Sequence, residues 1–169
     1  MSTTLHWMDG PWPGRLALSS RPRGGDWLDD EIKHWKDAGI SAVLSLLTKD
    51  EEGDLGLQNE AESVKAAGMK FLSFPIPDRQ VPASDASVTA AIERLDAELT
   101  SGNNVLVHCR QGIGRTGLMA ASLLIMKGLS PGAALENVSA ARGAAVPETA
   151  EQRRWIDHYA TFFATSKSR

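Results

Sequence analysis

The chain has 169 residues, of which 42% are hydrophobic and 23% charged, so it is long enough for one buried domain and has the composition of a globular protein. Eighteen basic and twenty-one acidic side chains give a net charge of −3, which provides no overall positive field for nucleic acid. The single cysteine, Cys109, excludes an internal disulfide. No apolar run approaches the ~18 residues that span a bilayer, and residues 1–8 lack the pattern of a signal peptide. We therefore expect a cytoplasmic chain with a reduced cysteine that binds neither nucleic acid nor membranes, and we predict no particular oligomeric state.

Apolar runs of strand length alternate along the chain with stretches of helical periodicity. We expect strands at residues 16–18, 40–47, 69–74 and 104–108, the first of them at an edge of the sheet. We expect helices at residues 26–38, 57–67, 84–99, 118–126 and 130–142, and a last one from 148 into the 160s. Asp26 suits the N-cap of the first helix, and Ser84 and Ser130 suit those of two later helices.

This alternation predicts a single α/β domain with a central, mostly parallel sheet of about four to five strands and helices on both faces. The helix at 118–126 is apolar on every side and therefore belongs at the centre. We divide the chain into an N-terminal extension at 1–14, a domain at 15–164 and a tail at 165–169. Trp27 and Trp35, eight residues apart, are expected to share a helix face that packs on the sheet.

The segment from His108 to Gly117 carries the clearest chemistry. Cys109 follows a buried strand, five residues intervene, and Arg115 and Thr116 then open a helix. A glycine-rich turn between a strand and a helix points successive backbone N–H groups inward and binds an anion at the positive end of the helix dipole. The Arg115 guanidinium can hold two oxygens of one phosphoryl group, and the same field favours the thiolate of Cys109. The segment thus suits nucleophilic attack on phosphorus.

Two other interpretations of this segment compete with that one. A lone cysteine is most often a small buried hydrophobic residue. Residues 112–117 also match the glycine pattern of dinucleotide-binding loops, with Glu136 at a suitable distance. That fold requires a second parallel strand after the helix, whereas Ser130 opens another helix here. It also leaves Cys109 and Arg115 without a role, so we favour the phosphoryl-transfer loop.

The pattern His108-Cys109-x5-Arg115-Thr116 resembles the signature of the cysteine-based protein tyrosine phosphatases, and the short chain points to their dual-specificity branch. Residues 74–82 resemble the general-acid loop of that branch. Its C-terminal helices have similar counterparts here at residues 129–131, 140–143 and 148–152. The likeness covers most of residues 15–160 and extends to the cyclin-dependent-kinase-associated phosphatases and small bacterial relatives. It implies a dual-specificity phosphatase fold and an enzyme that hydrolyses phosphotyrosine, with phosphoserine and phosphothreonine as further substrates.

The resemblance also implies roles for individual residues. Cys109 is the expected nucleophile, Arg115 binds the phosphoryl group, and Thr116 hydrogen-bonds the sulfur when it leaves. Asp78, in a proline-stiffened loop 31 residues before Cys109, is the expected general acid, ahead of Asp85, Asp50 and Glu51. This chemistry requires neither a metal nor a cofactor. The expected substrate-binding residues are Arg110, Gln111, Gly112, Ile113, Gly114 and Gln152.

Four polar residues near the predicted site keep two interpretations each. His108 either helps to set the loop and the thiolate or is packed in the core. Gln152 matches a glutamine that orients water in relatives, or is outside the site. Glu148 stands where relatives have a second glutamine, and either adds negative charge near an anion site or faces solvent. Arg79 either meets a second charge on the substrate or is solvated.

The expected partner is a phosphorylated protein. An alternative is a phosphoinositide phosphatase or an RNA 5′-phosphatase, which the overall acidity and the single extra loop cation, Arg110, disfavour. A second alternative is a non-catalytic phosphate-binding module. Binding alone needs neither a nucleophile nor an acid, so the presence of both Cys109 and Asp78 disfavours it.

Overall fold

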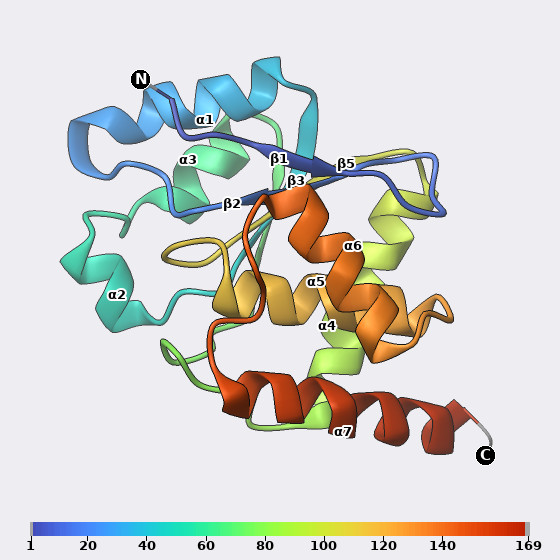
Figure 1. The fold of residues 1–169 in the computed structure, drawn as a ribbon. Coiled ribbons are helices and arrows are strands. Elements are labelled where there is room, and N and C mark those ends of the chain that lie inside the picture. The colour runs from blue at the N-terminus through green and yellow to red at the C-terminus, as the bar shows by residue number, and fades with distance from the viewer. Residues whose placement is uncertain (1, 168–169) are drawn as a thin grey trace.

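The computed structural model describes residues 2–167, which form a five-stranded sheet with helices on both faces (Figure 1). The spatial strand order is β1-β2-β5-β3-β4, in which β1 is antiparallel to β2 and the other neighbours are parallel. The predicted α/β domain with a mostly parallel sheet is confirmed. The strands are β1 (His6–Met8), β2 (Leu16–Ser19), β3 (Ile40–Ser45), β4 (Lys70–Ser73) and β5 (Asn104–His108).

Two layers of helices cover the sheet. Helices α1 and α3 lie on one face, and α4, α5 and α6 lie on the other, with α7 packed outside α5 (Figure 1). Ser84 and Ser130 cap α4 and α6 as predicted, because each hydroxyl accepts the N–H three residues later. The helices are α1 (Leu28–Asp37), α2 (Lys49–Asp54), α3 (Glu60–Ala66), α4 (Asp85–Thr100), α5 (Gly114–Met126), α6 (Pro131–Arg142) and α7 (Ala150–Lys167), with a 3₁₀ turn at Gly25–Trp27.

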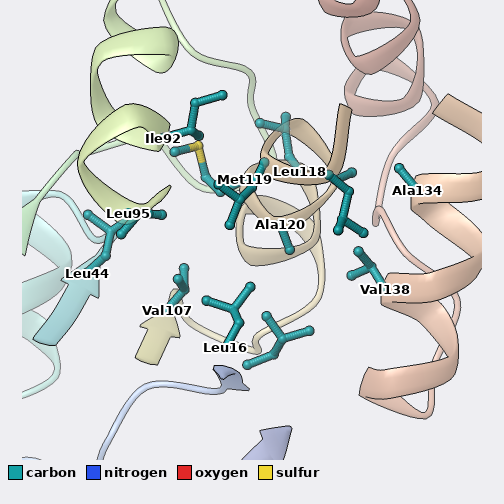
Figure 2. Close-up of a cluster of buried hydrophobic side chains, with 14 of the residues drawn as sticks. Leu16, Leu44, Ile92, Leu95, Val107, Leu118, Met119, Ala120, Ala134 and Val138 are labelled. Atoms are coloured by element: carbon teal, nitrogen blue, oxygen red, sulfur yellow. The ribbon is translucent and has the colours of Figure 1, made fainter. Parts of the chain in front are cut away.

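Alternation along the inner strands divides the buried side chains into two cores. In β2, Leu16 and Leu18 face the core on the α5 side, whereas Ala17 faces the α1 side. Helix α5 lies at the centre of the larger core, as the nearly all-apolar stretch at residues 118–126 predicts. Figure 2 shows its side chains between the sheet and the neighbouring helices α4 and α6.

The parallel strands end side by side. Ser19 at the end of β2 pairs in register with His108 at the end of β5, which in turn pairs with Ser45 of β3. Ser45 is paired with Ser73 of β4. Because the carboxyl ends of four strands are aligned, the segments that follow them converge at one edge of the sheet.

The structure corrects three expectations in the N-terminal quarter of the chain. Residues 16–19 form an inner strand and not an edge strand, because His6–Met8 pairs with them on the side away from β5. The segment His6–Met8 is too short to be predicted as a strand from its own apolar pattern. Asp26 caps no helix, since it lies within the 3₁₀ turn and α1 begins only at Leu28. Trp27 therefore precedes the helix and is 55% exposed with Arg23 over its ring, whereas Trp35 is fully buried as predicted.

Helix α2 was not predicted, although the sequence contains a local signal for its start. Thr48 and Glu51 form a capping box, in which each side chain accepts the backbone N–H of the other, and this starts α2. At the C-terminus α7 continues to Lys167, while residues 168 and 169 of the expected tail lie outside the described residues. The division at residues 14/15 and 164/165 stays a prediction. Between residues 2 and 167, no helix is both long and apolar enough to span a membrane.

Candidate active site

The loop between β5 and α5 has its peptide carbonyls turned outward. The carbonyl of Arg110 accepts the N–H of Arg21 at 3.2 Å, and those of Gln111 and Gly112 each accept from Arg142 at 3.0 Å. In a planar trans peptide the N–H points opposite to the C=O, so the amides of residues 111–113 face the inside of the loop. The loop therefore has the inward ring of N–H groups that an anion requires.

The sulfur of Cys109 lies within this ring of amides. Its Sγ accepts the N–H of Gly112 at 3.2 Å. Only 2% of the Cys109 surface is exposed, because β5 is buried up to its last residue and the loop closes over the sulfur. The sulfur is therefore enclosed by the loop and held by one of its backbone amides.

Gly112 allows the loop to pack closely on the end of β2. Its φ of +75° lies in the left-handed region, which residues other than glycine adopt at a cost. A Cβ at this position would also lie 2.5 Å from the Ser19 carbonyl oxygen. Both constraints call for glycine, so this residue of the predicted loop has a backbone role.

The guanidinium of Arg115 is buried and reaches from the start of α5 across the carboxyl edge of the sheet. It binds both carboxylate oxygens of Glu51, at 2.6 and 2.9 Å, and donates to the Ile76 carbonyl at 2.8 Å. Burial by itself lowers the pKa of Arg115, but its hydrogen bonds with Glu51 and the nearby charges of Cys109 and Asp78 outweigh burial and raise the pKa. The arginine is therefore charged and oriented before any ligand arrives.

Glu51 connects α2 to the site. Its carboxylate accepts the Thr48 N–H in the capping box as well as the two hydrogen bonds from Arg115. Burial raises the pKa of Glu51, but the hydrogen bonds from Arg115 and Thr48 are together stronger and lower it. Sequence reasoning weighed Glu51 only as a competitor for the acid, whereas the structure makes it the partner that orients Arg115.

Asp78 contacts Arg115, the arginine of the predicted loop. Its Oδ1 accepts a hydrogen bond from Nη2 of Arg115 at 3.0 Å, and 46% of its side chain is exposed. Neither Asp85 nor Asp50 makes such a contact: Asp85 accepts from His158, and Asp50 is exposed on α2. The assignment of Asp78 as the acid stays a prediction that this position supports.

Two contacts tie the Asp78 segment to the start of α7. Arg79 has a left-handed backbone, with φ of +62°, and its guanidinium pairs with Glu148 at 2.9 Å. Gln152 is fully buried, and its Nε2 donates to the Gln80 carbonyl while its Oε1 accepts the amides of Glu148 and Thr149. Glu148 therefore neutralises Arg79. The Gln152 amide also borders the loop, since a Cβ on Gly114 would lie 3.0 Å from its Oε1.

Beneath the loop, His108 is fully buried and bonded to a carboxylate. Its Nε2 lies 2.6 Å from Oε2 of Glu60, and its Nδ1 lies 3.3 Å from the Cys109 carbonyl oxygen. The ring also packs 6.0 Å from that of Trp35, between centroids. His108 is thus a buried core residue that also contacts the backbone at Cys109, and its role in setting the thiolate stays a prediction.

The remaining predicted site residues occupy different positions. Arg110 and Gln111 are exposed, whereas Ile113 is half-buried and directly precedes α5. The Thr116 hydroxyl is buried and has no hydrogen-bond partner among the described residues, so its bond to the sulfur stays a prediction. Arg142 was not predicted as a site residue, although it lies in the segment 140–143 that resembles a C-terminal helix of the family. In the described part of the chain, no three His, Cys, Asp or Glu side chains are grouped to hold a metal ion.

Comparisons with known proteins agree with this geometry. A family profile described as "Polymorphic toxin system, DSP-PTPase phosphatase" matches residues 18–129. Cyclin-dependent kinase inhibitor 3 of Sus scrofa is 27% identical over 134 residues, which are 78% of this chain and 63% of that protein. The chain thus spans less than two thirds of the length of this curated relative.

Two solved structures have the same fold over nearly the whole chain. A kinase-associated phosphatase with its catalytic-site cysteine substituted by serine superimposes with a TM-score of 0.90 at 22% identity, covering 97% of each chain. Tk-PTP in its active form gives 0.76 at 26% identity, covering 93% of this chain and 96% of that one.

The fold and the matching profile place the chain in the dual-specificity class of the cysteine-based phosphatases. Within that class, the chain belongs to the DSP-PTPase phosphatase family of the matching profile.

Proposed function

We propose that this chain hydrolyses phosphate monoesters on proteins, phosphotyrosine and also phosphoserine and phosphothreonine, through a cysteinyl-phosphate intermediate. The observation that carries the proposal is that two groups of the loop at residues 108–117 meet a third from a distant segment, Asp78. Arg115 is hydrogen-bonded to Asp78, and its charge interacts with that of Cys109, whose sulfur lies within the amide ring. A nucleophile, an anion-binding guanidinium and a proton donor are the groups that this reaction needs.

In the first step the Cys109 thiolate attacks phosphorus and the bond from phosphorus to the ester oxygen breaks. Asp78 gives its proton to the departing oxygen, while Arg115 and the loop amides hold the three equatorial oxygens of the transferred group. In the second step water attacks the phosphocysteine, the S–P bond breaks, and Asp78 takes a proton from the water. Inorganic phosphate leaves and the thiolate is restored.

The C-terminal contacts supply a supporting role in this scheme. Gln152 joins the Asp78 segment to the start of α7 and lies beside Gly114 of the loop, so its role in this scheme is to hold the acid segment next to the site. A role for its amide in orienting the water rests on the resemblance alone. A phosphorylated protein as partner and a cytoplasmic location belong to the same proposal, the latter resting on the lone cysteine.

The test is a turnover panel of the intact protein and its Cys109→Ser variant on an aryl phosphate, phosphotyrosine and phosphothreonine peptides, and phosphoinositide vesicles. We expect hydrolysis of the aryl phosphate and the peptides, and a loss of at least about 10⁴-fold in kcat in the variant, because a serine hydroxyl lacks the activation of the thiolate. Binding of vanadate should persist in the variant, since the amide ring and Arg115 remain.

Each other outcome points to a different function. Turnover that survives in Cys109→Ser would mean that another group is the nucleophile. Hydrolysis of the vesicles in preference to the peptides would favour the phosphoinositide alternative. Oxyanion binding without turnover of any substrate would favour the phosphate-binding module.

A further inference from the structure

The arginine that orients two peptides of the catalytic loop is itself held by the N-terminal strand. Arg142 donates through Nε and Nη2 to the carbonyls of Gly112 and Gln111, and its remaining nitrogen, Nη1, lies 3.0 Å from Nε2 of His6. All three nitrogens of the planar guanidinium are therefore bonded, two to the loop and one to the imidazole. His6 thus acts on the loop through Arg142.

Elements from the two ends of the chain bring these side chains together. His6 is the first residue of β1 and pairs with Leu18 of β2, whereas Arg142 is the last residue of α6, which packs against β1. The contact joins residues that are 136 positions apart. The strand β1 therefore does more than cover the outer side of β2, because it also supplies a side chain that supports the loop.

The hydrogen bond fixes the protonation state of the imidazole. A guanidinium has N–H groups only and never accepts, so Nε2 of His6 accepts from Arg142 and the ring carries its single proton on Nδ1. Burial and the charge of Arg142 both lower the pKa of His6, which agrees with a neutral ring at neutral pH. The contact can exist only while His6 is uncharged.

The charged groups around His6 also oppose its protonation. The cavity of about 460 Å³ that His6 lines contains four arginines, Arg21, Arg23, Arg110 and Arg142. None of the described residues that line this cavity is acidic. Nearby, Glu31 is already paired with Arg23, and Asp9, which follows β1, is paired with Arg15. A proton on His6 would therefore add a positive charge to a cluster that is already positive, at a cost in free energy.

The two arginines that shape the site differ in the partner that holds them. Arg115 is held by the carboxylate of Glu51, whose lowered pKa keeps it charged in mild acid. Arg142 is held by an imidazole, the side chain that ordinarily changes its charge between pH 5 and 8. When His6 gains a proton it can no longer accept, and two cations face each other. The loop carbonyls then lose the fixed donor that keeps the neighbouring N–H groups turned inward.

We propose that His6 is a positioning residue for the hydrolysis reaction, whose neutral ring holds Arg142 on the catalytic loop and whose protonation releases it. The inference rests on the proposed function and adds a limit to that activity on the acid side. The inward amides bind the oxygens of the phosphoryl group before and during its transfer. A less ordered loop should therefore lower kcat/KM for a substrate and weaken the binding of inorganic phosphate.

The experiment compares the pH profiles of kcat/KM for an aryl phosphate in the intact protein and in His6→Gln, between pH 8 and about 4.5. A glutamine amide oxygen can accept from Arg142 and does not titrate. The ratio of the two values cancels the ionisation of the substrate, Cys109 and Asp78, which both proteins share. We expect a ratio near one at pH 8 and a fall of about tenfold as the pH drops through the pKa of His6, below its ordinary value of 6.5.

Two further variants control the measurement. His6→Ala removes the acceptor at every pH, so its kcat/KM should be about tenfold lower than that of the intact protein at pH 8, a loss that His6→Gln should not show. His34→Gln replaces a half-buried histidine of α1, on the opposite face of the sheet, and should match the intact protein at every pH. A ratio for His6→Gln that is independent of pH, or an unchanged kcat/KM in His6→Ala at pH 8, would overturn the proposal.

The failure of this inference can be distinguished from failure of the phosphatase activity. If no substrate turns over, the proposed function fails, and the role of His6 is then tested with inorganic phosphate, whose Kd is measured by NMR from the amide shifts of residues 111–113. A Kd that is about tenfold higher in His6→Ala than in His6→Gln at pH 8 would support the positioning role even then. Equal Kd values would reject it.

Discussion

Residues 108–117 and residues 74–84 both follow parallel strands at the same edge of the sheet, but different interactions hold them. The cysteine loop is held through its backbone, by β5, α5, the Arg142 guanidinium and the close approach of Gly112 to β2. The Asp78 segment returns to the sheet by backbone hydrogen bonds only up to Ile76. Beyond it, Asp78, Arg79 and Gln80 are exposed and reach the site through contacts with Arg115, Glu148 and Gln152.

This difference matches the two tasks. A nucleophile among amides must not move, because a displacement of about 1 Å is costly to catalysis. An acid that now binds Arg115 must release it when a phosphoryl group takes its place, so side-chain contacts on an exposed segment suit it better. We therefore expect substitutions in the two regions to affect different steps of the reaction.

The largest effect outside the nucleophile is expected from Asp78→Asn. An asparagine cannot supply a proton, so kcat for substrates with poor leaving groups should fall about 10³-fold, and far less for an aryl phosphate with a good leaving group. The measurement is kcat across a series of leaving groups of graded acidity. Equal losses of kcat across the series would mean that another residue is the acid and that the exposed Asp78 segment does not have this task.

A smaller effect is expected from Glu51→Gln, which leaves Arg115 charged and buried without its bidentate partner. Removing one partner of a buried ion pair costs about 3 kcal/mol of the free energy of unfolding, and misorientation of the guanidinium should lower kcat/KM about 10²-fold. Denaturant unfolding and steady-state kinetics measure both. Asp50→Asn, an exposed carboxylate on the same helix, is the control, and equal effects of the two variants would argue against the role of Glu51.

The ion pair between Glu51 and Arg115 should also make the stability of the protein depend on pH. The pKa of Glu51 is lower in the folded protein than its ordinary value of 4.5 in an unfolded chain. Its pairing therefore contributes stability in full above about pH 4.5, and that contribution is lost as the pH falls through the lower, folded-state pKa. The difference in unfolding free energy between the intact protein and Glu51→Gln should be constant from pH 6 to about 5 and shrink under more acidic conditions. A difference independent of pH down to 3 would contradict the assignment.

The smallest effect is expected from Arg79→Ala, which removes a largely exposed contact between the acid segment and α7. Exposed ion pairs contribute at most about 1 kcal/mol, so kcat for a poor leaving group should fall no more than about fivefold. Arg154→Ala, which removes an exposed arginine of α7, is the matched control. A loss as large as that of Asp78→Asn would mean that the segment depends on Arg79 far more than its exposure suggests.

The sequence predicted the parts of this molecule that depend on local pattern. The strand before Cys109, the apolar helix after it and the caps at Ser84 and Ser130 follow from spacing and residue type alone. The rule that parallel strands end at one edge predicted that the Asp78 segment and the cysteine loop would lie near each other, and Asp78 indeed contacts Arg115. These features need no knowledge of which side chains meet across the fold.

The features that sequence analysis missed depend on contacts between residues far apart in the chain. The short strand His6–Met8 has no pattern of its own and exists because β2 offers an unpaired edge. Glu51 and Arg142 reach the loop from α2 and α6, and nothing within either helix indicates that contact. Trp27 was wrongly predicted to lie in the first helix, because α1 begins one residue later, at Leu28. Sequence patterns do not locate a helix start to within one residue.

The hydrogen bond between Arg115 and Asp78 has a thermodynamic consequence. A phosphate dianion that binds Arg115 displaces a carboxylate that already occupies this guanidinium. Anion binding is therefore opposed by an internal ligand, and the affinity of Cys109→Ser for a phosphopeptide should rise when Asp78→Asn is added. Calorimetric titration of the two variants would reveal this competition as a difference between their dissociation constants.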